Sequence, residues 1–338
     1  MTCKWLCVLG IFLSMAVLSG QQRWLGAGER ATATDGKWTE YPLPNPGSGP
    51  TTIELAPDGT VWFTERSGNR IGRINQDGTG LREFPLPNPN SSPRIIALGA
   101  DGNMWFSEHT GNRMGRISPD GTIAEFAIPT PNSMPRAIAL GADGNIWFGE
   151  FAGGKIGRIT TAGTVTGFTI PKVKTGEITT GADGALWFAH FRGKIGRITT
   201  TGATTEFTLS TENASPGAIT TGPDGALWFT ESVGGKILRT TTDGTITEFA
   251  LANPNAQPWG ITTGPDGALW FTEASCVREP GSRCTVGNKI GRITTTGVVT
   301  EFSIPSDGSG SHSITTGPDG ALWFTEYYGS RIGRLVLP

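Results

Sequence analysis

The sequence has little charge, few cysteines and no sustained helical periodicity. Charged residues make up 17% of the chain, and a net charge of −2 attracts neither nucleic acid nor an anionic membrane surface. We therefore exclude nucleic acid and membrane lipid as main partners. No stretch repeats its apolar residues at the helical period, so almost no helix is expected beyond the first part of the chain.

Residues 1–20 have the layout of a secretory signal peptide. A lysine precedes the apolar run Trp5–Leu18, and the small residues Ser19 and Gly20 stand before a polar stretch. The run is short for a permanent membrane span, although an uncleaved anchor is the alternative. We predict a signal peptide over 1–20, a linker over 21–37, and a secreted or periplasmic protein that leaves the membrane once the leader is cleaved.

Cysteine is confined to two pairs. Cys3 and Cys7 would leave with the leader, so only Cys276 and Cys284 remain. In an oxidising compartment these two would form a disulfide that closes a small loop. Their spacing without neighbouring histidines makes a poor zinc site.

A tryptophan–phenylalanine segment recurs seven times, as in Gly264–Glu273. Its copies are 40 to 43 residues apart, except for a last interval of 53 that contains the cysteine pair. Each copy is followed by a run such as Lys289–Ile293 and then Thr300–Phe302, with glycine, aspartate and proline between the segments. This pattern predicts a repeat unit of four short strands. The tryptophans are Trp62, Trp105, Trp147, Trp187, Trp228, Trp270 and Trp323.

The chain begins and ends on complementary parts of a repeat. Trp38–Pro44 matches the fourth strand alone, and Arg331–Pro338 matches a third strand that lacks its fourth. Pairing of the two would close a ring and remove the exposed sheet edge. We predict an all-β, seven-bladed β-propeller over 38–338, closed by pairing of the N-terminal strand with the last blade, and we expect a monomer.

Variable positions within the repeat are candidates for function, because constant ones serve blade geometry. Two positions before the isoleucine of each inner strand the residue changes from copy to copy, as expected of a ligand-binding rim. Trp259 would stack on a flat or sugar-like ligand, or pack beneath the cysteine loop. His312 would act as a base near neutral pH, or be an ordinary surface histidine. The set is Thr51, Arg94, Arg136, Gly176, Gly217, Trp259 and His312.

A glutamate closes the second strand of six copies. Six carboxylates on one rim could attract a cation, or they could bond to arginine or backbone groups and hold the blades in register. The sequence leaves both interpretations open. The glutamates are Glu65, Glu108, Glu150, Glu231, Glu273 and Glu326.

The repeated pattern G-P-D-G-A-L-W-F-T-E, K-I-G-R-I-T and T-E-F closely resembles the streptogramin B lyases, the virginiamycin B lyase family. The resemblance covers about residues 38–338. It implies a seven-bladed propeller that opens a cyclic depsipeptide antibiotic by magnesium-assisted elimination at an ester, with a histidine base on the inner strand of the last blade. His312 occupies that place. There a base removes the proton α to a carbonyl while the metal stabilises the developing enolate.

Other positions implied by the resemblance carry different residues here. A second histidine would fall on Trp259, and a metal-binding glutamate on Gly310. The remaining metal-binding carboxylate would fall beside Tyr327, which leaves Glu326 as the nearest metal ligand. A first-blade tyrosine would fall on Thr51.

Two functional hypotheses follow. The first is a carbon–oxygen lyase that confers antibiotic resistance, with His312 as base, Glu326 binding Mg²⁺, and Trp259, Arg94, Arg136, Tyr327 and Thr51 binding the cyclic peptide. The second is a non-catalytic extracytoplasmic propeller that binds a glycan, a peptide or a protein.

Overall fold

The computed structural model describes residues 36–170, 174–191, 193–211, 214–274 and 288–337. Within these residues the chain forms strands joined by turns, and no helix is present. The described part of the chain accordingly has no helical segment with the length and hydropathy of a transmembrane span. The predicted signal peptide and nearly all of the predicted linker lie outside the described residues.

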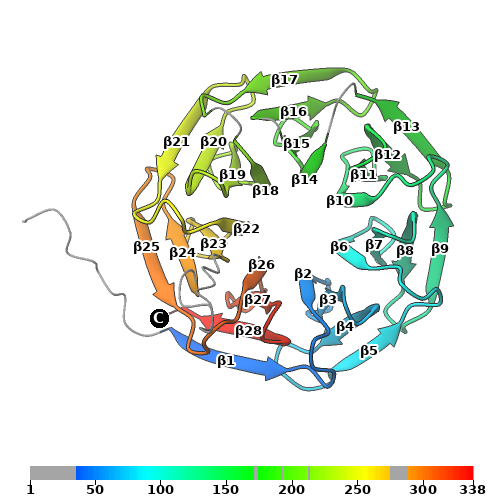
Figure 1. Cartoon of the computed structure of the whole chain (residues 1–338), viewed down its shortest axis with the longest axis horizontal. Helices are drawn as coiled ribbons and strands as arrows, with labels where there is room; N and C mark the ends of the chain where they lie inside the picture. The colour runs from blue at the N-terminus through cyan, green and yellow to red at the C-terminus, as the bar shows by residue number, and fades with distance from the viewer. Residues whose placement is uncertain (1–35, 171–173, 192, 212–213, 275–287, 338) are drawn as a thin grey trace, which may run out of the picture. The chain divides into compact units, whose positions relative to one another are not determined.

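The strands form seven four-stranded antiparallel sheets, which are arranged as the blades of a ring (Figure 1). Residues of the innermost strands line a central cavity, which we call the channel. The first three blades, from the channel outward, are β2 (Pro50–Leu55), β3 (Val61–Glu65), β4 (Arg70–Ile74) and β5 (Arg82–Pro85); β6 (Pro93–Leu98), β7 (Met104–Glu108), β8 (Arg113–Ile117) and β9 (Ile123–Ala127); and β10 (Pro135–Leu140), β11 (Ile146–Glu150), β12 (Lys155–Ile159) and β13 (Val165–Thr169). The next three are β14 (Thr175–Thr180), β15 (Leu186–His190), β16 (Lys194–Ile198) and β17 (Thr204–Thr208); β18 (Pro216–Thr221), β19 (Leu227–Glu231), β20 (Lys236–Thr240) and β21 (Ile246–Ala250); and β22 (Pro258–Thr263), β23 (Leu269–Glu273), β24 (Lys289–Ile293) and β25 (Val299–Ser303). The seventh is β26 (Ser311–Thr316), β27 (Leu322–Glu326), β28 (Arg331–Val336) and β1 (Lys37–Pro42).

The seventh blade joins the two ends of the propeller. Its outer strand β1 pairs antiparallel with β28 over six residues of each strand, side by side in Figure 1. Tyr41 of β1 stacks on Trp323 of β27, with ring centroids 5.6 Å apart. The prediction of seven blades closed by the N-terminal strand is therefore confirmed, and the closure covers the edge that β28 would otherwise expose.

Apolar clusters between neighbouring blades form the core. Side chains alternate across a strand, so the second strand of each blade buries a tryptophan on one face and a phenylalanine on the other. Trp147 of β11 packs with Phe188 of the following blade, and the same contact recurs around the ring. The third-strand glycine leaves room for the phenylalanine, since a Cβ on Gly157 would lie 2.2 Å from the ring of Phe148.

The recurring third-strand arginine belongs to this scaffold. In blade four, Nε of Arg197 donates a hydrogen bond of 2.7 Å to Asp183 in the turn before β15. The same carboxylate accepts the indole N–H of Trp187 at 3.1 Å. The guanidinium also lies 5.9 Å from the centroid of that indole. The aspartate of this tight turn thus ties the turn to the second and third strands of the same blade.

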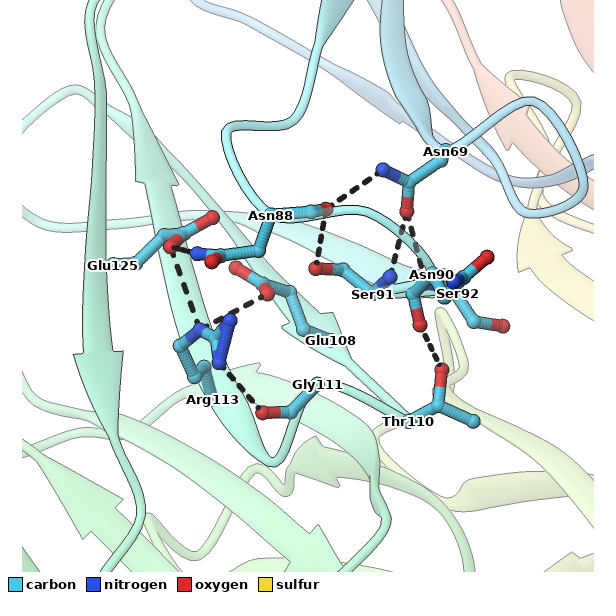
Figure 2. Close-up of polar contacts among 10 residues, drawn as sticks. All are labelled: Asn69, Asn88, Asn90, Ser91, Ser92, Glu108, Thr110, Gly111, Arg113 and Glu125. Atoms are coloured by element: carbon cyan, nitrogen blue, oxygen red, sulfur yellow. Dashed lines mark hydrogen bonds and ion pairs between the residues drawn. The ribbon is translucent and has the colours of Figure 1, made fainter.

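The glutamate at the end of the second strand also belongs to the scaffold. The carboxylate of Glu108 lies 3.5 Å from Nε of Arg113, and the same Nε lies 3.4 Å from the carboxylate of Glu125 on the outer strand. Figure 2 shows both contacts. Glu108 is completely buried, and this burial raises its pKa. These contacts favour the interpretation that the glutamates hold strands together over the interpretation that they attract a cation.

An asparagine network fixes the loop that crosses from one blade to the next. Oδ1 of Asn69 accepts the backbone N–H groups of Ser91 and Ser92 at 2.8 and 3.2 Å (Figure 2). Nδ2 of Asn69 donates to the carbonyl of Asn88 at 2.9 Å. Asn69 itself has a φ of 53°, a conformation that asparagine tolerates better than most residues. The start of the next inner strand is thereby held in place.

Candidate functional site

Every inner strand begins with a shift in register, and this shift shapes one mouth of the channel. In blade six, Trp259 and Gly260 lie together opposite the single residue Thr272 of β23. A comparable irregularity occurs in all seven blades. A bulge of this kind turns side chains away from the regular alternation of a strand. We call this end of the channel the variable mouth.

A repeated backbone hydrogen bond brings a second residue of each blade to the variable mouth. The residue after the second strand donates its N–H to the carbonyl that precedes the inner strand, as Tyr327 does to Gly310 and Ala274 does to Gln257, both at 3.2 Å. Gln257 has a φ of 46°, a strained conformation of the kind found at ligand sites. The residues placed in this way are Arg66, His109, Phe151, Phe191, Ser232, Ala274 and Tyr327.

A cavity of about 400 Å³ opens at the variable mouth beside blades six and seven. Its volume lies in the range of small-molecule sites. The walls combine aromatic rings with two guanidinium groups, so the cavity offers both stacking surfaces and positive charge. The lining residues are Arg66, Arg94, Gln257, Trp259, Ala274, Gly310, His312, Tyr327 and Tyr328.

Four rings form a continuous row along this cavity. The centroid of His312 lies 4.6 Å from that of Trp259 and 6.0 Å from that of Tyr327. Tyr327 in turn meets Tyr328 edge to face at 5.1 Å. We call Trp259, His312, Tyr327 and Tyr328 the aromatic row. Adjacent rings at these distances present a broad apolar wall to a ligand with a flat group.

His312 is neutral in this setting. Burial lowers the pKa of His312 to about 3, and the positive charges of Arg94, Arg136 and Arg66 act in the same direction. A neutral imidazole has a free nitrogen that could accept a proton. Its conjugate acid is disfavoured by the same surroundings, however, which makes His312 a weak base at neutral pH.

Arginines supply the charge of the variable mouth. Arg94 is 9% exposed, and burial lowers its pKa to about 9, as do the charges of Arg136 and Arg66. The guanidinium of Arg136 lies between two rings, 4.8 Å from the centroid of Phe191 and 5.6 Å from that of Phe151. Thus Arg94 faces the cavity and Arg136 forms a cation–π cluster at the mouth.

Two other predicted site residues, Thr51 and Arg136, are not part of the cavity lining. Thr51 is 1% exposed and its hydroxyl donates to the carbonyl of Gly49 at 3.1 Å, so its side chain is not part of the cavity lining. Arg136 is also absent from that lining. Cys276 and Cys284 lie outside the described residues, and their pairing stays a prediction.

The residues of the variable mouth do not fit the divalent cation that the family resemblance implies. Glu326 is fully buried, accepts a hydrogen bond of 2.9 Å from Nε of Arg331, and forms an ion pair with its Nη2 at 2.7 Å. Gly310 has a φ of 58°, and a Cβ there would lie 2.3 Å from the ring of Tyr328. Within the described ranges, no three histidine, cysteine, aspartate or glutamate side chains gather as a metal site. Nearby guanidinium groups would moreover repel a cation.

Several residues of the variable mouth were not predicted from the sequence. Arg66, Phe151, Phe191 and Tyr328 all lie at or just after the end of a second strand. The residue after the second-strand glutamate or histidine has a different kind of side chain in nearly every copy, as does the residue two positions before the inner-strand isoleucine. That variability was the signal that could have found the first three.

The fold and the site together define a seven-bladed β-propeller with a ligand-sized cavity at one mouth of its channel. The model of the virginiamycin B lyase family matches residues 28–177 and 282–337. The chain belongs to this family, as the repeated motif indicated.

Solved structures and a curated relative agree with this assignment. A crystal structure of virginiamycin B lyase from Staphylococcus aureus is 40% identical, with a TM-score of 0.83, and the match covers 90% of this chain and 100% of that chain. A catalytically inactive histidine-to-alanine variant from the same organism, with quinupristin, is 39% identical, with the same TM-score of 0.83 and the same coverage of 90% and 100%. The virginiamycin B lyase of Bacillus licheniformis is 48% identical over 42 residues, a segment that spans 12% of this chain and 14% of that protein.

Proposed function

We propose that this propeller binds a small peptide-like molecule, of the cyclic-peptide class, in the cavity at the variable mouth. The observation that carries the proposal is the aromatic row, which lines a cavity of about 400 Å³ with ring centroids 4.6 to 6.0 Å apart. Aromatic walls with a few polar groups are typical of small-molecule sites. Because a relative was crystallised with quinupristin, a cyclic peptide is the first ligand class to test. A glycan is the other class that stacks on such rings.

A carbon–oxygen lyase is the second candidate, favoured by His312. In the elimination, the proton α to a carbonyl passes to the neutral imidazole, the carbon–oxygen bond of the ester breaks, and an alkene and a carboxylate remain. No water is added, so a ring-opened product keeps the mass of its substrate. The low basicity of His312 weighs against rapid turnover, because proton transfer is most efficient when the pKa of the base is near the working pH. The metal implied by the resemblance finds no suitable carboxylate here, and no step is assigned to it.

Titration with quinupristin tests both candidates in one experiment. Calorimetry measures binding, and chromatography coupled to mass spectrometry measures the recovered ligand with and without Mg²⁺. The binding proposal expects saturable binding and unchanged quinupristin. A product of equal mass and altered retention that His312→Ala abolishes would instead establish the lyase. Absence of binding by quinupristin and by a panel of oligosaccharides would refute the proposed binding function.

The place of action, outside the cytoplasm, is part of the proposal and depends on the predicted leader. N-terminal sequencing of the exported protein tests this point. A mature protein that begins near residue 21 supports it, whereas a retained leader on a cell-bound protein contradicts it.

A further inference from the structure

We infer that the natural ligand of the variable mouth carries a carboxylate, which Arg94 and Arg66 bind while an adjacent aromatic group lies against the aromatic row. The ligand class is thus an aromatic acid, such as a peptide-like molecule, cyclic or linear, that carries a free carboxylate beside an aromatic group. The inference rests on the proposed binding function and specifies its ligand.

The first reason to expect a carboxylate on the ligand is that Arg94 is buried without an ion-pair partner in the part of the chain that the structure describes. Its side chain is 9% exposed, its Nε is buried without a hydrogen-bond partner, and no carboxylate forms an ion pair with it among the described residues. Most third-strand arginines of the described residues are ion-paired instead, as Arg239 is with Asp224 at 2.6 Å. Burying a charged group without a partner is costly, and such a group at the wall of a cavity is a candidate for ligand binding.

The surrounding charges are the second reason. The fields of Arg66, Arg94 and Arg136 all act on His312. Glu177 of β14 is the carboxylate whose charge acts on Arg94 and Arg136, and it lines the deeper part of the channel rather than the mouth cavity. Three guanidinium groups against one carboxylate leave the mouth positive, which attracts an anion and opposes a cation.

The shape of the cavity is the third reason. Arg94 and Arg66 line the same cavity as Trp259 and Tyr327. A guanidinium is planar and matches a carboxylate through two parallel hydrogen bonds, while the rings offer a surface for a flat apolar group. A ligand that joins a carboxylate to an aromatic group would satisfy both walls at once.

The test compares two probes that differ in one charge, N-acetyl-L-phenylalanine and N-acetyl-L-phenylalanine amide, by isothermal titration calorimetry. We expect the acid to bind at least about tenfold more tightly, the effect typical of a charge-assisted hydrogen bond. Arg94→Gln should abolish this preference. Arg82→Gln, which removes an equal charge from an exposed position on outer strand β5, should retain it.

Circular dichroism verifies that each variant is folded, and Arg66→Gln replaces Arg94→Gln if the latter fails to fold, with the same expectation. Equal affinity for the two probes, or no binding of the acid, would overturn the inference. Quinupristin binding would then still support the proposed function, so the two proposals fail separately. A preference for the acid that persists in both mouth variants would also overturn the assignment to these arginines.

Discussion

Replacing His312 by glutamine should change how the stability of the protein depends on pH. The pKa of this imidazole falls from 6.5 to about 3 in the folded protein, chiefly through burial and further through Arg94, Arg136 and Arg66. Below about pH 6.5 the unfolded chain therefore binds a proton at this position that the folded chain does not bind. The stability contributed by the neutral imidazole is fully present above that pH and is lost as the pH falls toward 3.

The size of the effect follows from the two pKa values. At about pH 4.5, two units below the ordinary pKa of histidine, the loss reaches at most about 2.7 kcal/mol at about 1.36 kcal/mol per unit. Because the imidazole borders a water-accessible cavity, we expect about 1 to 2 kcal/mol. This is large enough to measure by urea-induced unfolding.

The assay compares the wild-type protein with His312→Gln at about pH 7.5 and about pH 4.5. The free energy of unfolding of the wild type should drop more on acidification than that of the variant, by the amount given above. Carboxyl groups with raised pKa values, such as Glu54 in the channel, occur in both proteins and cancel in the difference. An equal response of the two proteins, or a larger loss in the variant, would refute the claim that burial, aided by the positive mouth, keeps His312 neutral.

Three further predictions concern binding and closure. Trp259→Ala should weaken quinupristin binding about tenfold, because it removes a wall of the cavity, and should leave the melting temperature nearly unchanged. An unaltered affinity in calorimetry would contradict this prediction. Tyr41→Ala should lower the free energy of unfolding by about 2 kcal/mol, because it removes the ring stacked on Trp323 in the blade that closes the propeller. A urea midpoint equal to that of the wild type would contradict a role of Tyr41 in the closure. Gly310→Glu should destabilise the protein by about 2 kcal/mol, because position 310 has a positive φ and the new side chain would overlap the ring of Tyr328. Adding Tyr328→Ala should recover part of this loss in thermal unfolding, whereas a Gly310→Glu variant as stable as the wild type would show that the space beside Tyr328 is free.

The blades could be predicted because each one is specified locally. The repeated tryptophan, the Asp-Gly turn and the third-strand glycine recur at fixed positions, and each has a contact that explains it. The closing strand was visible for a different reason: Trp38–Pro44 had no strands of its own blade before it, and Arg331–Pro338 had none after it. Each of the two segments therefore needed a pairing partner, and the structure pairs them with each other as β1 and β28.

The site could be predicted only in part, because its geometry depends on departures from regular strands. The register shift at the start of the inner strand occurs both at Thr51 and at the equivalent Arg94, yet the short Thr51 side chain is buried while the longer Arg94 side chain lines the cavity. The backbone hydrogen bonds that place Arg66 and Phe151 at the mouth join residues that are distant in the sequence, so the sequence does not reveal them. Tyr328 fills space beside Gly310, a contact that depends on a local φ rather than on a motif.

The central claim is that the ligand occupies the variable mouth beside blades six and seven. A crystal structure of the protein with quinupristin bound tests it most directly. The account predicts ligand density against Trp259, His312 and Tyr327. Density at the opposite end of the channel, or elsewhere on the blades, would contradict it.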